Sequence, residues 1–80
     1  MAAEAMSLQL PYVAAALGMG IAVIGGGYGI GRLAASAVEG IARQPQASGA
    51  IGTNMIITAA MIEGATLIAE ILCFMIVILK

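Results

Sequence analysis

The stretch IGTNMIITAAMIEGATLIAEILCFMIVIL, residues 51–79, decides the fold of this chain. It stays apolar over more than the roughly 20 residues that an α-helix needs to cross the hydrocarbon core of a bilayer. Glu63 lies near its middle, where an ionised carboxylate costs about 2.5–3.5 kcal/mol on insertion scales. A carboxylate retained at that depth indicates a function, and we predict that Glu63 binds and releases a cation.

The composition of the whole chain also favours a membrane protein. The chain has 80 residues, of which 62% are apolar and 9% charged, and its mean hydropathy is +1.11. A chain this short cannot bury a large core, and in water it would expose enough apolar surface to aggregate. We therefore expect an all-α membrane protein surrounded by lipid. The net charge of −1 gives no indication of nucleic acid as a partner.

The charged residues divide the chain into two membrane spans. There are 27 uncharged residues between Glu4 and Arg32, and 19 between Arg43 and Glu63. Pro45 disfavours helix at the residue before it, so the turn belongs there. Backbone groups in lipid must be satisfied internally, and 80 residues cannot close a barrel. We predict a single hairpin over residues 1–80, with helices over 8–42 and 49–79 and a loop over 43–48.

Basic residues predict the orientation of this hairpin. The first apolar segment has no basic region before it and is longer than a signal-peptide core, so we expect a membrane span. Arg32 and Arg43 lie beside or in the loop, which the positive-inside rule places in the cytoplasm, with both termini outside. Lys80 is a single opposing charge. The sequence begins without a recognisable targeting leader, which favours the inner (plasma) membrane of a bacterium over that of an organelle.

Small residues in the first helix predict close helix packing on two sides. At 100° per residue they form two stripes about 200° apart. The stripes are Gly18, Ala22, Gly25 and Gly29, and Gly20, Gly27 and Gly31. Small residues let helices approach closely in lipid, and a neighbour on each side is the arrangement of a closed ring. The run from Gly29 to Ala34 matches a dinucleotide-binding fingerprint, but the chain has no room for the βαβ unit which that motif needs.

Three motifs together resemble the c subunit of F-type ATP synthase, over about residues 12–79. They are the alternate glycines Gly25, Gly27, Gly29 and Gly31, the run VEGIARQP over residues 38–45, and a carboxylate 20 residues after Arg43. The resemblance implies a non-catalytic rotor subunit without a cofactor. Its hairpins would form a homo-oligomeric ring, with Glu63 binding the transported proton and Arg43, Gln44 and Pro45 contacting the central stalk. It also implies a stator a subunit with an essential arginine. Gln46 departs from the acidic residue that often follows the Arg-Gln-Pro triplet.

The transported ion is predicted from the neighbours of Glu63. Sodium-coupled members of the family have a glutamine 33 positions before the carboxylate and a serine directly after it, where this chain has Ile30 and Gly64. Thr66 could offer a hydroxyl, but we expect it to bond to a carbonyl of its own helix. Sodium needs several oxygen ligands, so we predict the proton and no metal site. A sodium-coupled rotor is the alternative.

Glu70 is a second carboxylate at membrane depth. It lies seven residues after Glu63, on nearly the same helix face and about 10 Å further along the axis. Three roles are open for it: a protonated hydrogen-bond partner within the structure, part of the proton route to Glu63 from outside, or a second coupling site. A ring-forming pore or holin-like hairpin, in which Glu63 faces a wet lumen, is the competing function, and the Arg-Gln-Pro loop favours the rotor.

Overall fold

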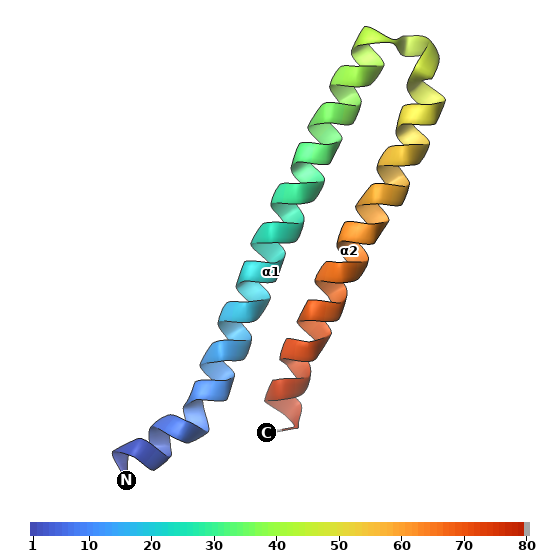
Figure 1. The fold of residues 1–80 in the computed structure, drawn as a ribbon. Helices are drawn as coiled ribbons and strands as arrows, with labels where there is room; N and C mark the ends of the chain where they lie inside the picture. Colours follow the sequence, from blue (N-terminus) through green and yellow to red (C-terminus); the bar gives the residue numbers. More distant parts are fainter. Residues whose placement is uncertain (80) are drawn as a thin grey trace.

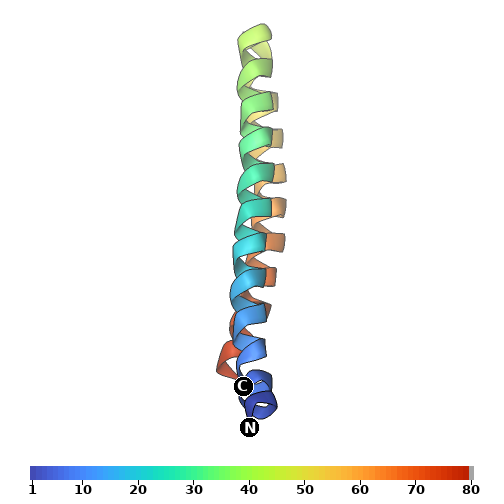
Figure 2. The same ribbon diagram turned by 90° about the vertical axis from the view of Figure 1, so that its left-hand side faces the viewer.

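The chain forms a hairpin of two long antiparallel helices. The computed structural model describes residues 1–79, so Lys80 and its predicted opposing charge lie outside the described residues. The elements are α1 (Ala2–Arg43), the short 3-10 helix η1 (Pro45–Ala47) and α2 (Ser48–Ile78). The helices lie side by side, with the loop at one end and both termini at the other (Figure 1). The extents of 66 × 18 × 8 Å describe a single layer, seen edge-on in Figure 2. The predicted hairpin is confirmed.

The first helix begins at Ala2, earlier than the predicted start at residue 8. Its opening residues are rich in alanine and leucine, which favour helix. Glu4 lies in the first turn, where the helix dipole stabilises an acidic side chain. Pro11 lies inside α1 and does not end it. Because proline donates no hydrogen bond to the preceding turn, it bends a helix, and the turns before it splay away from the rest of α1 (Figure 1).

The loop is shorter than the predicted 43–48. Gln44 leaves the helical conformation, with φ −134° and ψ 79°, as expected of a residue before proline. Residues Pro45–Ala47 then form one 3-10 turn, in which the Ala47 amide donates to the Gln44 carbonyl at 2.9 Å. The second helix starts directly at Ser48 and ends at Ile78, one residue before the predicted end at 79. The reversal therefore depends on only four residues between the two helices.

Small side chains of α1 form the contact between the helices. The buried residues of α1 are Ala15, Gly26 and Ala37, each 11 residues apart, which is three helical turns. Larger side chains of α2 pack on glycines of α1. A Cβ built on Gly29 would lie 3.6 Å from Ile62 Cδ1, and one built on Gly40 would lie 3.3 Å from Ile51 Cδ1. Within residues 1–79, α2 has no fully buried residue, so one hairpin covers little of its own apolar surface.

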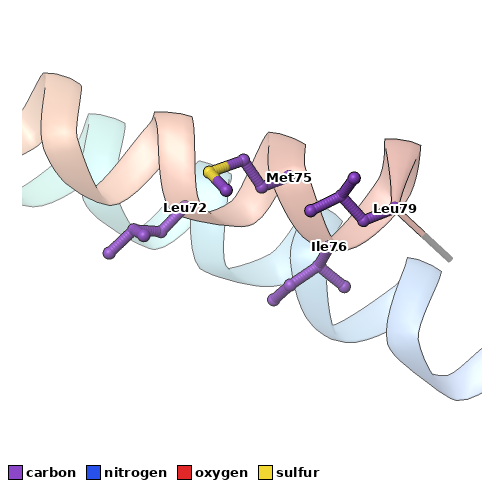
Figure 3. A pocket seen from close by; sticks show the side chains of 4 residues that line it. All are labelled: Leu72, Met75, Ile76 and Leu79. Atoms are coloured by element: carbon purple, nitrogen blue, oxygen red, sulfur yellow. The ribbon is translucent and has the colours of Figure 1, made fainter.

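The outer surface of the hairpin is largely apolar. Both helices are long and apolar enough, by length and composition alone, to cross a membrane. Figure 3 shows four side chains at the C-terminal end of α2 and directly after it, around a shallow hollow of about 350 Å³: Leu72, Met75, Ile76 and Leu79. The 66 Å length exceeds the roughly 30 Å of hydrocarbon in a bilayer, so the ends of the hairpin extend into the headgroups or beyond.

Candidate functional site

The candidate site is a groove between the two helices, halfway along α2. Glu63 is the central residue of α2, with 15 residues of the helix on each side. The groove is open to the surface, has a volume of about 310 Å³, and receives side chains from both helices. It is lined by Val23, Gly26, Gly27, Ile30, Glu63, Thr66 and Glu70. The fold thus brings together four residues that the sequence analysis singled out separately, namely Glu63, Glu70, Ile30 and Thr66.

The carboxylate of Glu63 has no partner inside the hairpin. Its side chain is exposed on the single chain, and it makes no hydrogen bond or ion pair with any part of residues 1–79. An ionised carboxylate left this way in lipid is expensive, whereas a protonated one costs much less. The geometry therefore leaves Glu63 free to exchange a proton with water or with another protein chain that covers the groove.

Thr66 bonds to its own helix, as predicted. Its hydroxyl donates to the Ile62 carbonyl at 2.9 Å and lies half-buried against α1. Directly opposite is Gly26, where a Cβ would lie 3.1 Å from Thr66 Cγ2 and closer still to the hydroxyl oxygen. Gly26 belongs to neither predicted glycine stripe, so the sequence analysis missed it. The 11-residue spacing of Ala15, Gly26 and Ala37 is the signal that could have found it.

In the structure, only some glycines of the predicted stripes contact α2. Gly18 and Gly29 do contact α2, since a Cβ on Gly18 would lie 2.8 Å from the Cys73 sulfur. Cys73 is a free cysteine, and this contact makes it a small packing residue between the helices. A Cβ on any of the other four glycines of the stripes would meet nothing within 4 Å: Gly20, Gly25, Gly27 and Gly31. Gly25 therefore does not share a contact with Gly18 and Gly29, and the packing of these four open glycines between hairpins stays a prediction.

Glu70 lines the same groove as Glu63, on the side toward the two termini. Its side chain is half-buried. Within residues 1–79 it has no hydrogen-bond or ion-pair partner. The predicted common face of the two carboxylates is confirmed, and any structural hydrogen bond to Glu70 would have to come from outside this stretch of the hairpin.

Arg32 and Arg43 do not line the groove. Arg32 Nη1 donates to the Tyr28 hydroxyl at 3.1 Å, and the guanidinium carbon is 5.8 Å from the centre of the Tyr28 ring. Arg43 Nη2 donates to Glu39 Oε1 at 2.5 Å within the last turns of α1. Arg43, Gln44 and Pro45 are all exposed at the tip of the hairpin. In the part of the chain that the structure describes, no group of three or more His, Cys, Asp or Glu could hold a metal ion.

Comparisons with known proteins agree on one family. The family model for the ATP synthase c subunit matches residues 13–76. The chain is 51% identical over 74 residues to an ATP synthase c subunit of Bacteroides thetaiotaomicron, covering 92% of this chain and 87% of that one. It is 54% identical over 72 residues to the ATP synthase c subunit of Phocaeicola vulgatus, covering 90% of this chain and 86% of that one. A more distant relative, the ATP synthase c subunit of Bacillus thuringiensis, is 35% identical over 69 residues, which cover 86% of this chain and 96% of that one. The chain therefore belongs to the family of ATP synthase c subunits, and it is a non-catalytic rotor subunit with two transmembrane helices.

Proposed function

We propose that Glu63 is the carboxyl group that takes up and releases the transported proton as the rotor turns. The observation that carries the proposal is the position of this residue. It is the central residue of an apolar helix, it lines a groove, and it has no partner within residues 1–79. A carboxyl group with these properties is tolerated in lipid when it carries a proton and must be covered or hydrated when it does not.

The ionised form of Glu63 costs more free energy in lipid than the protonated form, and this difference couples proton transfer to rotation. A loaded, neutral Glu63 passes through lipid, and an unloaded one needs an aqueous path and a positive charge beside it. Arg32 bonds to Tyr28 and Arg43 bonds to Glu39, so no basic residue within residues 1–79 supplies that charge in the groove. The stator a subunit is the partner that would supply it. The membrane potential contributes about 2.3 kcal/mol per charge per 100 mV and so sets the direction of turning.

The lining of the groove favours the proton over sodium. A hard cation requires several oxygen ligands in one shell. Ile30 contributes only hydrocarbon to the groove, and the Thr66 hydroxyl already donates its hydrogen to the Ile62 carbonyl. Glu70 lies about 10 Å along the axis from Glu63, too far to share one cation with it. A single carboxyl group with few oxygen neighbours suits a proton.

The remaining surfaces fit the other predicted partners. Further copies of the hairpin would cover the apolar flanks and the open glycines Gly25, Gly27 and Gly31, closing the homo-oligomeric ring. The exposed tip formed by Arg43, Gln44 and Pro45 would contact the central stalk. This arrangement requires the loop in the cytoplasm and both termini on the outside. Lipid covers the outer surface of the ring.

Carbodiimide labelling of the purified ring tests the site and the ion together. The reagent attacks protonated carboxyl groups, so we expect it to modify Glu63, more slowly as the pH rises and without protection by sodium. Protection by sodium would show that the ion is not the proton. In the reconstituted complex, Glu63→Gln should abolish ATP-driven proton pumping, whereas Glu4→Gln, a carboxylate at the exposed start of α1, should not. Pumping by Glu63→Gln would refute the proposed role.

A further inference from the structure

We propose that Glu70 is a relay residue, which passes the transported proton between Glu63 and the aqueous side at the two termini. The inference rests on the proposed role of Glu63 and assigns a second residue to the same transport step. The sequence left three roles open for Glu70, and the structure favours one of them.

Glu70 lies on α2 between Glu63 and the end of the hairpin that carries the two termini. It lies seven residues beyond Glu63, which is two turns and about 10 Å along the axis toward the termini. Both carboxyl groups line one groove, with Thr66 between them. The opposite flank of α2 at this level is apolar and includes Leu72 and Ile76, about 200–240° around the helix from Glu70 (Figure 3). The acidic side chain is thus confined to the side that carries Glu63.

Glu70 has no polar neighbour across the groove within the described residues 1–79. The α1 wall of the groove consists of Val23, Gly26, Gly27 and Ile30, none of which has a polar side-chain atom. Along residues 1–79 no hydrogen bond or ion pair reaches Glu70, although the side chain is half-buried. A carboxyl group retained only as a structural hydrogen-bond partner would need a donor or acceptor here. Within the described hairpin, the partner that the groove leaves for it is water.

The groove is large enough to hold water between the two carboxyl groups. Its volume of about 310 Å³ compares with about 30 Å³ per water molecule, so it has room for several waters when it is hydrated beside the stator. Two or three waters, about 2.8 Å apart, bridge a 10 Å separation. The spacing of the two residues along the helix therefore suits proton exchange through a short chain of water molecules.

The relay step balances without any further reactant. A hydronium ion on the outer side loses a proton to the Glu70 carboxylate, forming an O–H bond there. That O–H bond then breaks, the proton passes along the water chain, and an O–H bond forms on the Glu63 carboxylate. Glu70 returns to its ionised form, so each cycle delivers one proton to Glu63. The relay changes the rate of loading and leaves the number of protons per turn unchanged.

The test uses the complete ATP synthase, with the variant chain in its ring, reconstituted in lipid vesicles. Three quantities are measured: the ring content, the rate of ATP-driven proton pumping, and the proton-to-ATP ratio at thermodynamic balance. We expect Glu70→Gln to slow pumping about tenfold, with ring content and ratio unchanged. This is less than the ~10²-fold effect of a general acid–base group in an enzyme, because water can partly bypass the residue. Glu70→Asp should keep most of the rate, and Glu4→Gln all of it.

Each other role predicts a different result. Wild-type pumping by Glu70→Gln, which keeps the shape and hydrogen-bonding capacity of the side chain, would refute the relay. Loss of the ring in both Glu70→Gln and Glu70→Asp would show a structural role, and a fall in the proton-to-ATP ratio would show a second coupling site; either result overturns the proposal. Glu63→Gln in the same assay separates the two proposals. If it abolishes pumping while Glu70→Gln has no effect, only the relay is refuted.

Discussion

Replacing Gly26 with alanine should weaken the hairpin at the level of the site. The added Cβ would lie 3.1 Å from Thr66 Cγ2 and 3.3 Å from Thr66 Cβ, with the hydroxyl oxygen closer still. Real Cβ atoms essentially never make a contact as short as the one to this oxygen, so either the helices separate or Thr66 rotates. If Thr66 rotates, its hydroxyl loses the 2.9 Å bond to the Ile62 carbonyl.

The magnitude follows from three contributions. Overpacking of a well-packed contact costs about 1–3 kcal/mol. Loss of the Thr66 hydrogen bond costs a further ~0.5–1.5 kcal/mol. Alanine regains about 1 kcal/mol over glycine through its helix propensity. We therefore expect Gly26→Ala to destabilise the hairpin by about 2 kcal/mol.

The assay is the unfolding of the isolated hairpin in mixed micelles with increasing SDS. Dyes on the two termini, which lie at the same end of the hairpin, report the separation of the helices by energy transfer (Figure 1). Gly25→Ala and Gly27→Ala are matched controls, because a Cβ at either position meets nothing within 4 Å in the hairpin. These controls should be as stable as the wild type or slightly more stable, whatever they do to ring assembly.

A double-mutant cycle with Thr66→Ala tests the assigned cause. In the Thr66→Ala background most of the penalty of Gly26→Ala should disappear, although the Cβ of residue 66 remains 3.3 Å away. The coupling between the two positions should reach about 1–2 kcal/mol, as for other residues in direct contact. The reasoning is refuted if Gly26→Ala is as stable as Gly25→Ala, or if its penalty persists unchanged without the threonine.

Two further predictions concern the ends of the hairpin. Pro11→Ala restores a backbone hydrogen-bond donor, so it should straighten α1. Hydrogen exchange should then show the turns before residue 11 protected by up to ~3 kcal/mol more than in the wild type. An unchanged distance between spin labels on the two termini would contradict this prediction. Glu39→Gln should change the stability of the ring by no more than ~0.5 kcal/mol, because Arg43 and Glu39 are 76% and 64% exposed and salt bridges of this kind contribute little. A thermal dissociation experiment that shows a loss above about 1 kcal/mol would indicate a partner for Glu39 beyond its own helix.

Much of the site could be predicted because helix periodicity is a local property. Once residues 51–79 are recognised as a helix, the 100° step per residue places Glu63, Thr66 and Glu70 on nearly one face, and the structure confirms this. The bond from Thr66 to the Ile62 carbonyl is local in the same sense, since donor and acceptor lie one turn apart. These relations need no knowledge of where the first helix lies.

The sequence by itself determined the number of helices, the place of the turn and the depth of Glu63. Apolar length and Pro45 are sufficient for these, because solvation and backbone geometry act on each segment separately. Only the tertiary structure decided which side of α1 meets α2. The glycine pattern left that rotation open, because glycines occur all around the helix. Packing selected Gly26, together with Ala15 and Ala37, for the contact and left Gly25 outside it. The groove that joins Ile30 of one helix to Glu63 of the other exists only because of that choice.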